Sequence, residues 1–194
     1  MMAAAAAIIG GILEIIVALA GIATAIVLFS VLKKQSEGLA LGLVASRVLE
    51  ASTIFLGVAF LLSIVTLRQA GAGVDALVTS RTLVALYDRI FLLGQSFMPA
   101  VNDLLLGFLL YKSRLVPRSL SLIGLVGGPV LIAGYIAVLF GLIGQHAPLT
   151  GLFALPVALF EFSLGVWLTV KGFNSSAITS LSAKTETNEP LSRA

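Results

Sequence analysis

The sequence predicts an all-α protein, a polytopic transmembrane helix bundle with five spans. Of its 194 residues, 59% are hydrophobic and 11% are charged, whereas an ordinary soluble domain carries about 25% charged residues. Five apolar stretches are each long enough to cross a bilayer, which takes roughly 20 residues. Basic residues stand at the ends of these stretches. One helical domain over residues 1–174 accounts for nearly the whole chain.

The first two spans are expected at about residues 8–32 and 39–67. The first is too long for the ~7–15-residue core of a signal peptide and lacks a basic segment before it, so it is expected to be a retained helix. Gly38 and Gly42 form a small-xxx-small pair that permits close packing at the start of the second span. Three further spans are expected at about 82–111, 119–143 and 149–170.

Two polar segments flank the predicted spans. Residues 68–81 are rich in Gly, Ala and polar residues, which predicts a loop, with at most a short surface helix at 74–78. Residues 175–194 are rich in Ser and Thr, a composition typical of disorder. We therefore expect a disordered cytoplasmic tail.

The third span carries a polar stripe and is predicted to be the central helix. Two series of polar residues recur every seven positions, so at about 100° per residue they lie side by side on one face. Lipid does not solvate such a face, which must contact other helices or a wet cavity. Pro99 lies on the same face and is expected to kink the helix. The two series are Asp88, Gln95 and Asn102, and Arg89, Ser96 and Asp103.

The fourth span contains no ionisable residue and is rich in glycine. Its Gly124-xxx-Gly128 spacing is typical of helices that pack closely. We expect this helix to be peripheral or to form a self-association surface, which would make the protein a homo-oligomer.

Basic residues predict the orientation in the membrane. The ends of the first, third and fifth spans carry most of them, whereas the opposite side has only Arg68 and Arg81. By the positive-inside rule, the C-terminus is cytoplasmic. The expected location is the cytoplasmic membrane of a bacterial cell. The residues on the predicted inner side are Lys33, Lys34, Lys112, Arg114, Arg118, Lys171, Lys184 and Arg193.

Seven ionisable residues fall within the predicted spans, and their depths at about 1.5 Å per residue place them at two levels. An unpaired charge at a helix centre costs at least about 2.5 kcal/mol on insertion scales, so each should have a partner. We expect an outer polar cluster and an inner one. The outer cluster is Glu14, Asp88 and Arg89, and the inner cluster is Arg47, Glu50, Asp103 and Glu161, with Gln95 and Asn102 alongside.

The two arginines cannot neutralise the five carboxylates, so some acids are expected to be protonated, hydrated or balanced by a cation. Two functions compete. The clusters either bind or pass a cation, proton or small polar solute, or they only hold the packing of a structural or assembly subunit. An enzyme that uses paired carboxylates is a weaker alternative, since no Ser-His, metal-ligand or cofactor motif supports it.

Several partners and cofactors are excluded or disfavoured by composition. The chain has no cysteine and one histidine, His146, so thiolate metal sites are excluded and sites built on several imidazoles are disfavoured. Neither a metal nor a cofactor is predicted. Basic residues stand at segment ends rather than on one face, so nucleic acid is not an expected partner. The expected partner is the lipid bilayer.

Three segments carry a resemblance to a known family: LEIIVALAGIATAIVLFSVLKKQSEGLALGLVASRVLEA, LLYKSRLVPRSLSLIGLVGG and LPVALFEFSLGVWLTVKGF. Together they resemble the DUF4386 family of bacterial membrane proteins over roughly residues 10–174. The resemblance implies a helical membrane fold, and it implies no activity. It also implies a further N-terminal span, because this chain begins at what resembles the second helix of that family.

Overall fold

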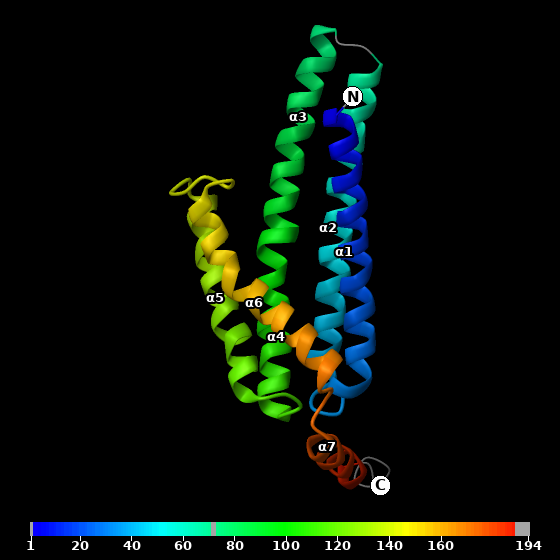
Figure 1. Ribbon diagram of the computed structural model, residues 1–194, viewed down its shortest axis with the longest axis vertical. Helices are drawn as coiled ribbons and strands as arrows, with labels where there is room; N and C mark the ends of the chain where they lie inside the picture. Colours follow the sequence, from blue (N-terminus) through cyan, green and yellow to red (C-terminus); the bar gives the residue numbers. More distant parts are fainter. Residues whose placement is uncertain (1, 71–72, 189–194) are drawn as a thin grey trace.

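The computed structural model describes residues 2–70 and 73–188, and this described part of the chain is helical throughout, apart from short turns (Figure 1). The helices are α1 (Met2–Leu32), α2 (Glu37–Gln69), α3 (Val74–Phe91), the π-helical segment η1 (Leu92–Phe97), α4 (Met98–Ser113), α5 (Arg118–Leu139), α6 (Pro148–Val170) and α7 (Ser175–Asn188).

Five helices in the described chain are long and apolar enough to cross a membrane, which confirms the predicted fold class. α3, η1 and α4 join into one of them, with 40 residues from Val74 to Ser113. Its start differs from the prediction, because most of the segment expected to be a loop is helical. Gly73 precedes the first turn, and Asp75 lies in that turn, where a negative charge interacts favourably with the helix dipole.

The C-terminal segment differs from the predicted disordered tail, because α7 covers Ser175–Asn188. Asn174 begins this helix: its side-chain oxygen accepts hydrogen bonds from the backbone N–H and the hydroxyl of Ser176. Ala177 and Leu181 are one turn apart and are both buried. Although the segment is polar in composition, these two residues form a short apolar face that packs α7 against the bundle. The expected tail also includes residues 189–194, which lie outside the described residues.

The main hydrophobic core lies at the end of the bundle where α1 turns into α2 and α4 turns into α5. It joins side chains of α1, α2, α4, α5, α6 and α7. At the opposite end, the α5–α6 hairpin diverges from α1, α2 and α3 (Figure 1). The bundle is thus held together most tightly near α7. Core members include Leu28, Leu32, Leu43, Leu109, Leu110, Leu115, Phe160, Leu164 and Leu181.

The helix from α3 to α4 is central, as predicted, since it contacts α2 along its length, α5 through η1 and α4, and α1 and α6 through α4. A π turn interrupts it at η1, just before Pro99. At this level Gly94 lies against α2: a Cβ atom placed on Gly94 would be 2.1 Å from the Thr53 hydroxyl oxygen. Glycine is therefore required for this close approach. The predicted irregularity occurs within the polar stripe, and its form is a π segment.

The glycines of α5 are used for packing inside the chain. A Cβ atom on Gly124 would be 2.7 Å from the ring of Phe160, and one on Gly134 would be 2.5 Å from Phe153. Both phenylalanines belong to α6. A self-association surface on α5 therefore stays a prediction, while the glycine-rich face itself is occupied by α6 and α4.

Candidate polar site between α2, α4 and α6

Arg47 is the centre of the inner polar site. Its Nη1 atom lies 2.9 Å from the Glu50 carboxylate, one turn along α2. Its Nη2 atom lies 2.5 Å from the carboxylate of Glu161 on α6. The aliphatic part of the Arg47 side chain faces Gly21 on α1, where a Cβ atom would be 3.7 Å from Arg47 Cδ. One guanidinium thus pairs with two acids and touches a third helix.

Asn102 connects this ion pair to α4. Its amide nitrogen donates a hydrogen bond of 2.8 Å to Glu50, and its amide oxygen accepts one from the Ser46 hydroxyl. Asn102 is fully buried, and Glu50 and Ser46 are nearly so. The chain Ser46–Asn102–Glu50–Arg47–Glu161 therefore joins α2, α4 and α6 by hydrogen bonds and ion pairs, from the buried Asn102 to Glu161, which is exposed on α6.

Asp103 is the unsatisfied member of the site. It is completely buried on α4, and neither carboxyl oxygen has a hydrogen-bond partner among the described residues. The charges of Glu161, Arg47 and Glu50 all act on this carboxyl group. The carboxyl groups of Glu50, Glu161 and Asp103 therefore all interact with the charge of Arg47. Asp103 is the most deeply buried of the three and has no hydrogen-bond donor within the described chain.

Two further polar residues lie near this site without joining its hydrogen-bond network. Gln95 is half-buried in η1, and its side chain makes no hydrogen bond within the described chain. The Ser121 hydroxyl is buried on α5 and has no partner among the described residues. Its residue packs on Gly107, one helical turn beyond Asp103. The structure thus unites five of the six predicted inner residues and leaves Gln95 outside the network, about two helical turns before Asn102.

The predicted outer residues are not joined to one another by a hydrogen bond or an ion pair in the described structure. Glu14 accepts a hydrogen bond from the Tyr87 hydroxyl. The backbone oxygen of Asp88 accepts one from Gln145, and its carboxylate lies 3.6 Å from His146. Arg89 is exposed. Asp88 therefore contacts the turn between α5 and α6, and Glu14 belongs to a separate contact between α1 and α3.

Helix length explains why the predicted outer cluster does not form. The continuous helix to Ser113 is about 60 Å long at 1.5 Å per residue, twice the bilayer core of about 30 Å. A stretch of about 20 residues is enough to cross the bilayer core, and counted back from Ser113 it ends in η1. Asp88 and Arg89 lie beyond that point, at the level of the α5–α6 turn, where solvent and head groups can pair with charges.

Sequence reasoning missed three donors in these contacts, Ser46, Tyr87 and Gln145, and also the buried hydroxyl of Ser121. Ser46 lies four residues before Glu50, on the same face of α2, and this spacing is the signal that could have identified it. Tyr87 precedes Asp88, but its partner on α1 is distant in sequence. Within the described residues, no group of three or more His, Cys, Asp or Glu side chains could hold a metal ion.

The fold and the buried site define a polytopic helical membrane protein with a charged interior. The family model described as a domain of unknown function, DUF4386, matches residues 1–172. The chain belongs to this family, which confirms the resemblance seen in the sequence. Comparison with curated proteins gave no match, and neither did comparison with solved structures.

Proposed function

We propose that this protein binds a proton inside the membrane at Asp103 and passes it along the polar interior. The observation that carries the proposal is the Asp103 carboxyl group, which is fully buried with no donor to either oxygen. A buried acid in this setting is stable only when it is neutralised or gains a partner. The neighbouring groups do not supply that partner, because Arg47 already pairs with Glu50 and Glu161.

A second buried group without a hydrogen-bond partner indicates the direction in which the proton would move. The Ser121 hydroxyl is buried without a partner among the described residues, and the Ser121 backbone lies against Gly107, one helical turn beyond Asp103 on α4. A hydroxyl both donates and accepts, so it can relay a proton. The network of ion pairs and hydrogen bonds from Glu161 to Asn102 would then hold the helices in place while the proton moves.

We also propose that α7 and the basic helix ends face the cytoplasm of a bacterial cell. Six cations flank the turns at one end of the bundle, and the opposite tip between α2 and α3 carries Arg68 and Arg81. This asymmetry supports the orientation given by the positive-inside rule. The six cations are Lys33, Lys34, Lys112, Arg114, Arg118 and Lys171.

A protonated buried carboxyl group has its own infrared carbonyl band, which offers a direct test. Protein reconstituted in a bilayer should lose such a band as the pH rises, and Asp103→Asn should lack it at every pH. Proteoliposomes that enclose a pH-sensitive dye should equilibrate an imposed pH gradient faster than empty liposomes, and Asp103→Asn should abolish the difference. A band that persists in Asp103→Asn would contradict the proposal.

A structural or assembly subunit is the second candidate, favoured by the continuous network that joins α2, α4 and α6. Under this alternative, Asp103→Asn lowers thermal stability, and wild-type liposomes equilibrate no faster than empty ones. Ser46→Ala provides a matched control, because it removes a network member that our proposal does not route a proton through. It should weaken packing while leaving proton passage intact.

A further inference from the structure

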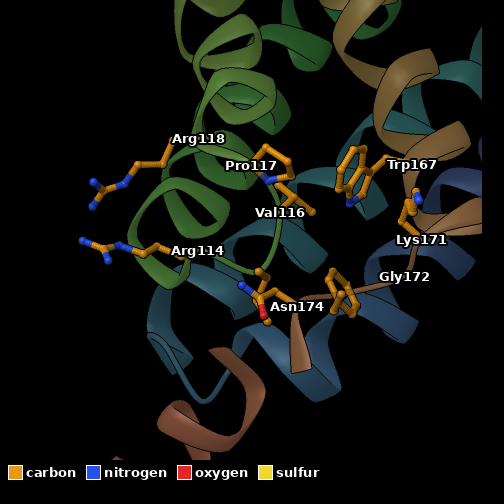
Figure 2. A pocket seen from close by; sticks show the side chains of 10 residues that line it. Arg114, Val116, Pro117, Arg118, Trp167, Lys171, Gly172 and Asn174 are labelled. Atoms are coloured by element: carbon orange, nitrogen blue, oxygen red, sulfur yellow. The ribbon is translucent and has the colours of Figure 1, made fainter. Parts of the chain in front are cut away.

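The turn between α4 and α5 and the turn between α6 and α7 enclose a cavity of about 510 Å³ that the proton site does not use. Figure 2 shows Trp167 and Lys171 on one side and the turn with Val116 and Pro117 on the other. We call this space the basic cavity. It is lined by Arg114, Leu115, Val116, Pro117, Arg118, Trp167, Lys171, Gly172, Phe173 and Asn174.

Three cations and no acid line the basic cavity. Arg114, Arg118 and Lys171 form no ion pair within the described residues. Arg114 and Arg118 extend side by side, away from Trp167 and out of the basic cavity, so their charges lie at its rim (Figure 2). They also line a second cavity of about 470 Å³ beside Lys112. The region therefore carries concentrated positive charge that the described side chains do not neutralise.

Two of these cations are held in defined positions. The Arg118 guanidinium lies over the Tyr111 ring, 4.9 Å from its centroid. Arg114 adopts a left-handed backbone conformation with φ of 57° at the end of α4. Such a position usually favours glycine or asparagine, so an arginine here is placed at a conformational cost.

The remaining walls of the basic cavity are apolar, and they continue onto the outer face of α6. Trp167 and Lys171 line both the basic cavity and a neighbouring groove with Phe162, Val166 and Val170. A further groove of about 440 Å³ extends along the same face past Gly165 to Glu161, whose carboxylate is paired with Arg47. A pocket with a cationic rim thus continues into a mostly apolar groove along a membrane-spanning helix.

We propose that this surface binds an anionic phospholipid, with its phosphate group at the cationic rim of the basic cavity and an acyl chain along the α6 grooves. The cations lie at helix ends, where spans meet the head-group region and where basic residues attract anionic lipid. Trp167 occupies the amphipathic position that tryptophan favours at this interface. A free phosphate would use the cations alone, whereas a phospholipid also fills the apolar walls and the grooves.

The head-group contact is tested by native mass spectrometry of the full-length, delipidated protein with phosphatidylglycerol and phosphatidylcholine of matched acyl chains. Phosphatidylglycerol should bind more tightly. Arg114→Asn combined with Lys171→Gln should weaken its binding roughly 30-fold, at about a fivefold loss per surface cation. Asparagine tolerates the left-handed conformation, so the turn is expected to persist.

A charge-matched control uses Lys33→Gln with Arg81→Gln, two cations outside both cavities. This control should keep the affinity for phosphatidylglycerol within about twofold of wild type, since surface charges act mainly within a Debye length. An equal loss in the control and the test variant would overturn the proposal, as would equal binding of the two lipids.

The acyl-chain contact is tested with Gly165→Leu, which places a side chain in the groove. A Cβ atom on Gly165 has no neighbour within 4 Å, so the variant should fold. It should weaken phosphatidylglycerol binding and leave inorganic phosphate binding unchanged, whereas Gly151→Leu, at an equally open position on α6, should change neither. Inorganic phosphate that binds as tightly as the lipid, with no effect of Gly165→Leu, would identify a simple anion pocket and refute the lipid site.

Discussion

Arg47 on α2 and Glu161 on α6 form an ion pair across the bundle, with 2.5 Å between Nη2 and Oε1. They are separated by 114 positions in the sequence, and α6 otherwise packs mainly on α5. The pair therefore ties the α5–α6 hairpin to the α1–α2 hairpin inside the apolar region. Because Arg47 also holds Glu50, its loss would affect two acids at once.

Arg47→Met should lower the free energy of unfolding by about 3 kcal/mol, since it leaves the buried carboxylate of Glu50 without its cation. Glu161→Gln should lower it by only about 1 kcal/mol, because its amide oxygen can still accept from Arg47. Equilibrium unfolding in mixed micelles measures both. Arg89→Met, at an exposed arginine without a described partner, should be nearly neutral, and an effect equal to that of Arg47→Met would contradict this account.

Gly94→Ala should destabilise the junction of η1 and α2 by about 1–3 kcal/mol, because the added methyl group overpacks the interior against Thr53. Thr53→Ala should recover part of this loss in the double variant, since it removes the nearest atom. A double-mutant cycle by thermal unfolding checks the coupling. Strictly additive effects would show that Gly94 is not limited by Thr53.

Gly124→Ala should destabilise the contact between α5 and α6 by about 1–3 kcal/mol, because the fully buried Phe160 ring has no room to move. Gly165→Ala is the matched control on α6. Its Cβ would meet open space, and alanine favours a helix over glycine by about 1 kcal/mol. Thermal unfolding should therefore move in opposite directions for the two variants.

Leu181→Asp should release α7 from the bundle, because it places a carboxylate in the hydrophobic core that Leu181 shares with α1, α2 and α4. Limited proteolysis and hydrogen exchange should then show cleavage and fast exchange across 175–188, with the membrane helices unchanged. Ser180→Asp, at an exposed position of the same helix, is the control. Equal exchange in both variants and the wild type would show that α7 is not docked.

Local pattern was sufficient for the spans and for most residues of the inner site. Hydropathy over windows of about 20 residues reports on lipid contact directly, so five helices could be predicted. The spacing of Arg47 and Glu50 places them on one face of α2, and the buried level of Asn102 and Asp103 followed from the polar stripe. These inferences need only helix geometry and the cost of placing charge in lipid.

Contacts between distant segments could not be predicted in the same way. The sequence did not show that Tyr87 reaches Glu14, that Gln145 reaches Asp88 or that α7 docks through Ala177 and Leu181. Each depends on how far a helix continues and on which elements pack beside it. The outer cluster was predicted from a span centred too far toward the N-terminus. The bilayer core, counted back from Ser113, ends at η1 and leaves Asp88 and Arg89 at the interface.

The sequence alone thus determined that this chain is a five-span helical membrane protein with carboxylates in excess over arginines in its interior, because hydropathy and charge are local properties. Only the tertiary structure decided which carboxylates Arg47 pairs with and that Asp103 has no donor. Pairing depends on distances of a few ångströms between helices, and those distances are fixed by close approaches such as Gly94 to Thr53 and Gly124 to Phe160.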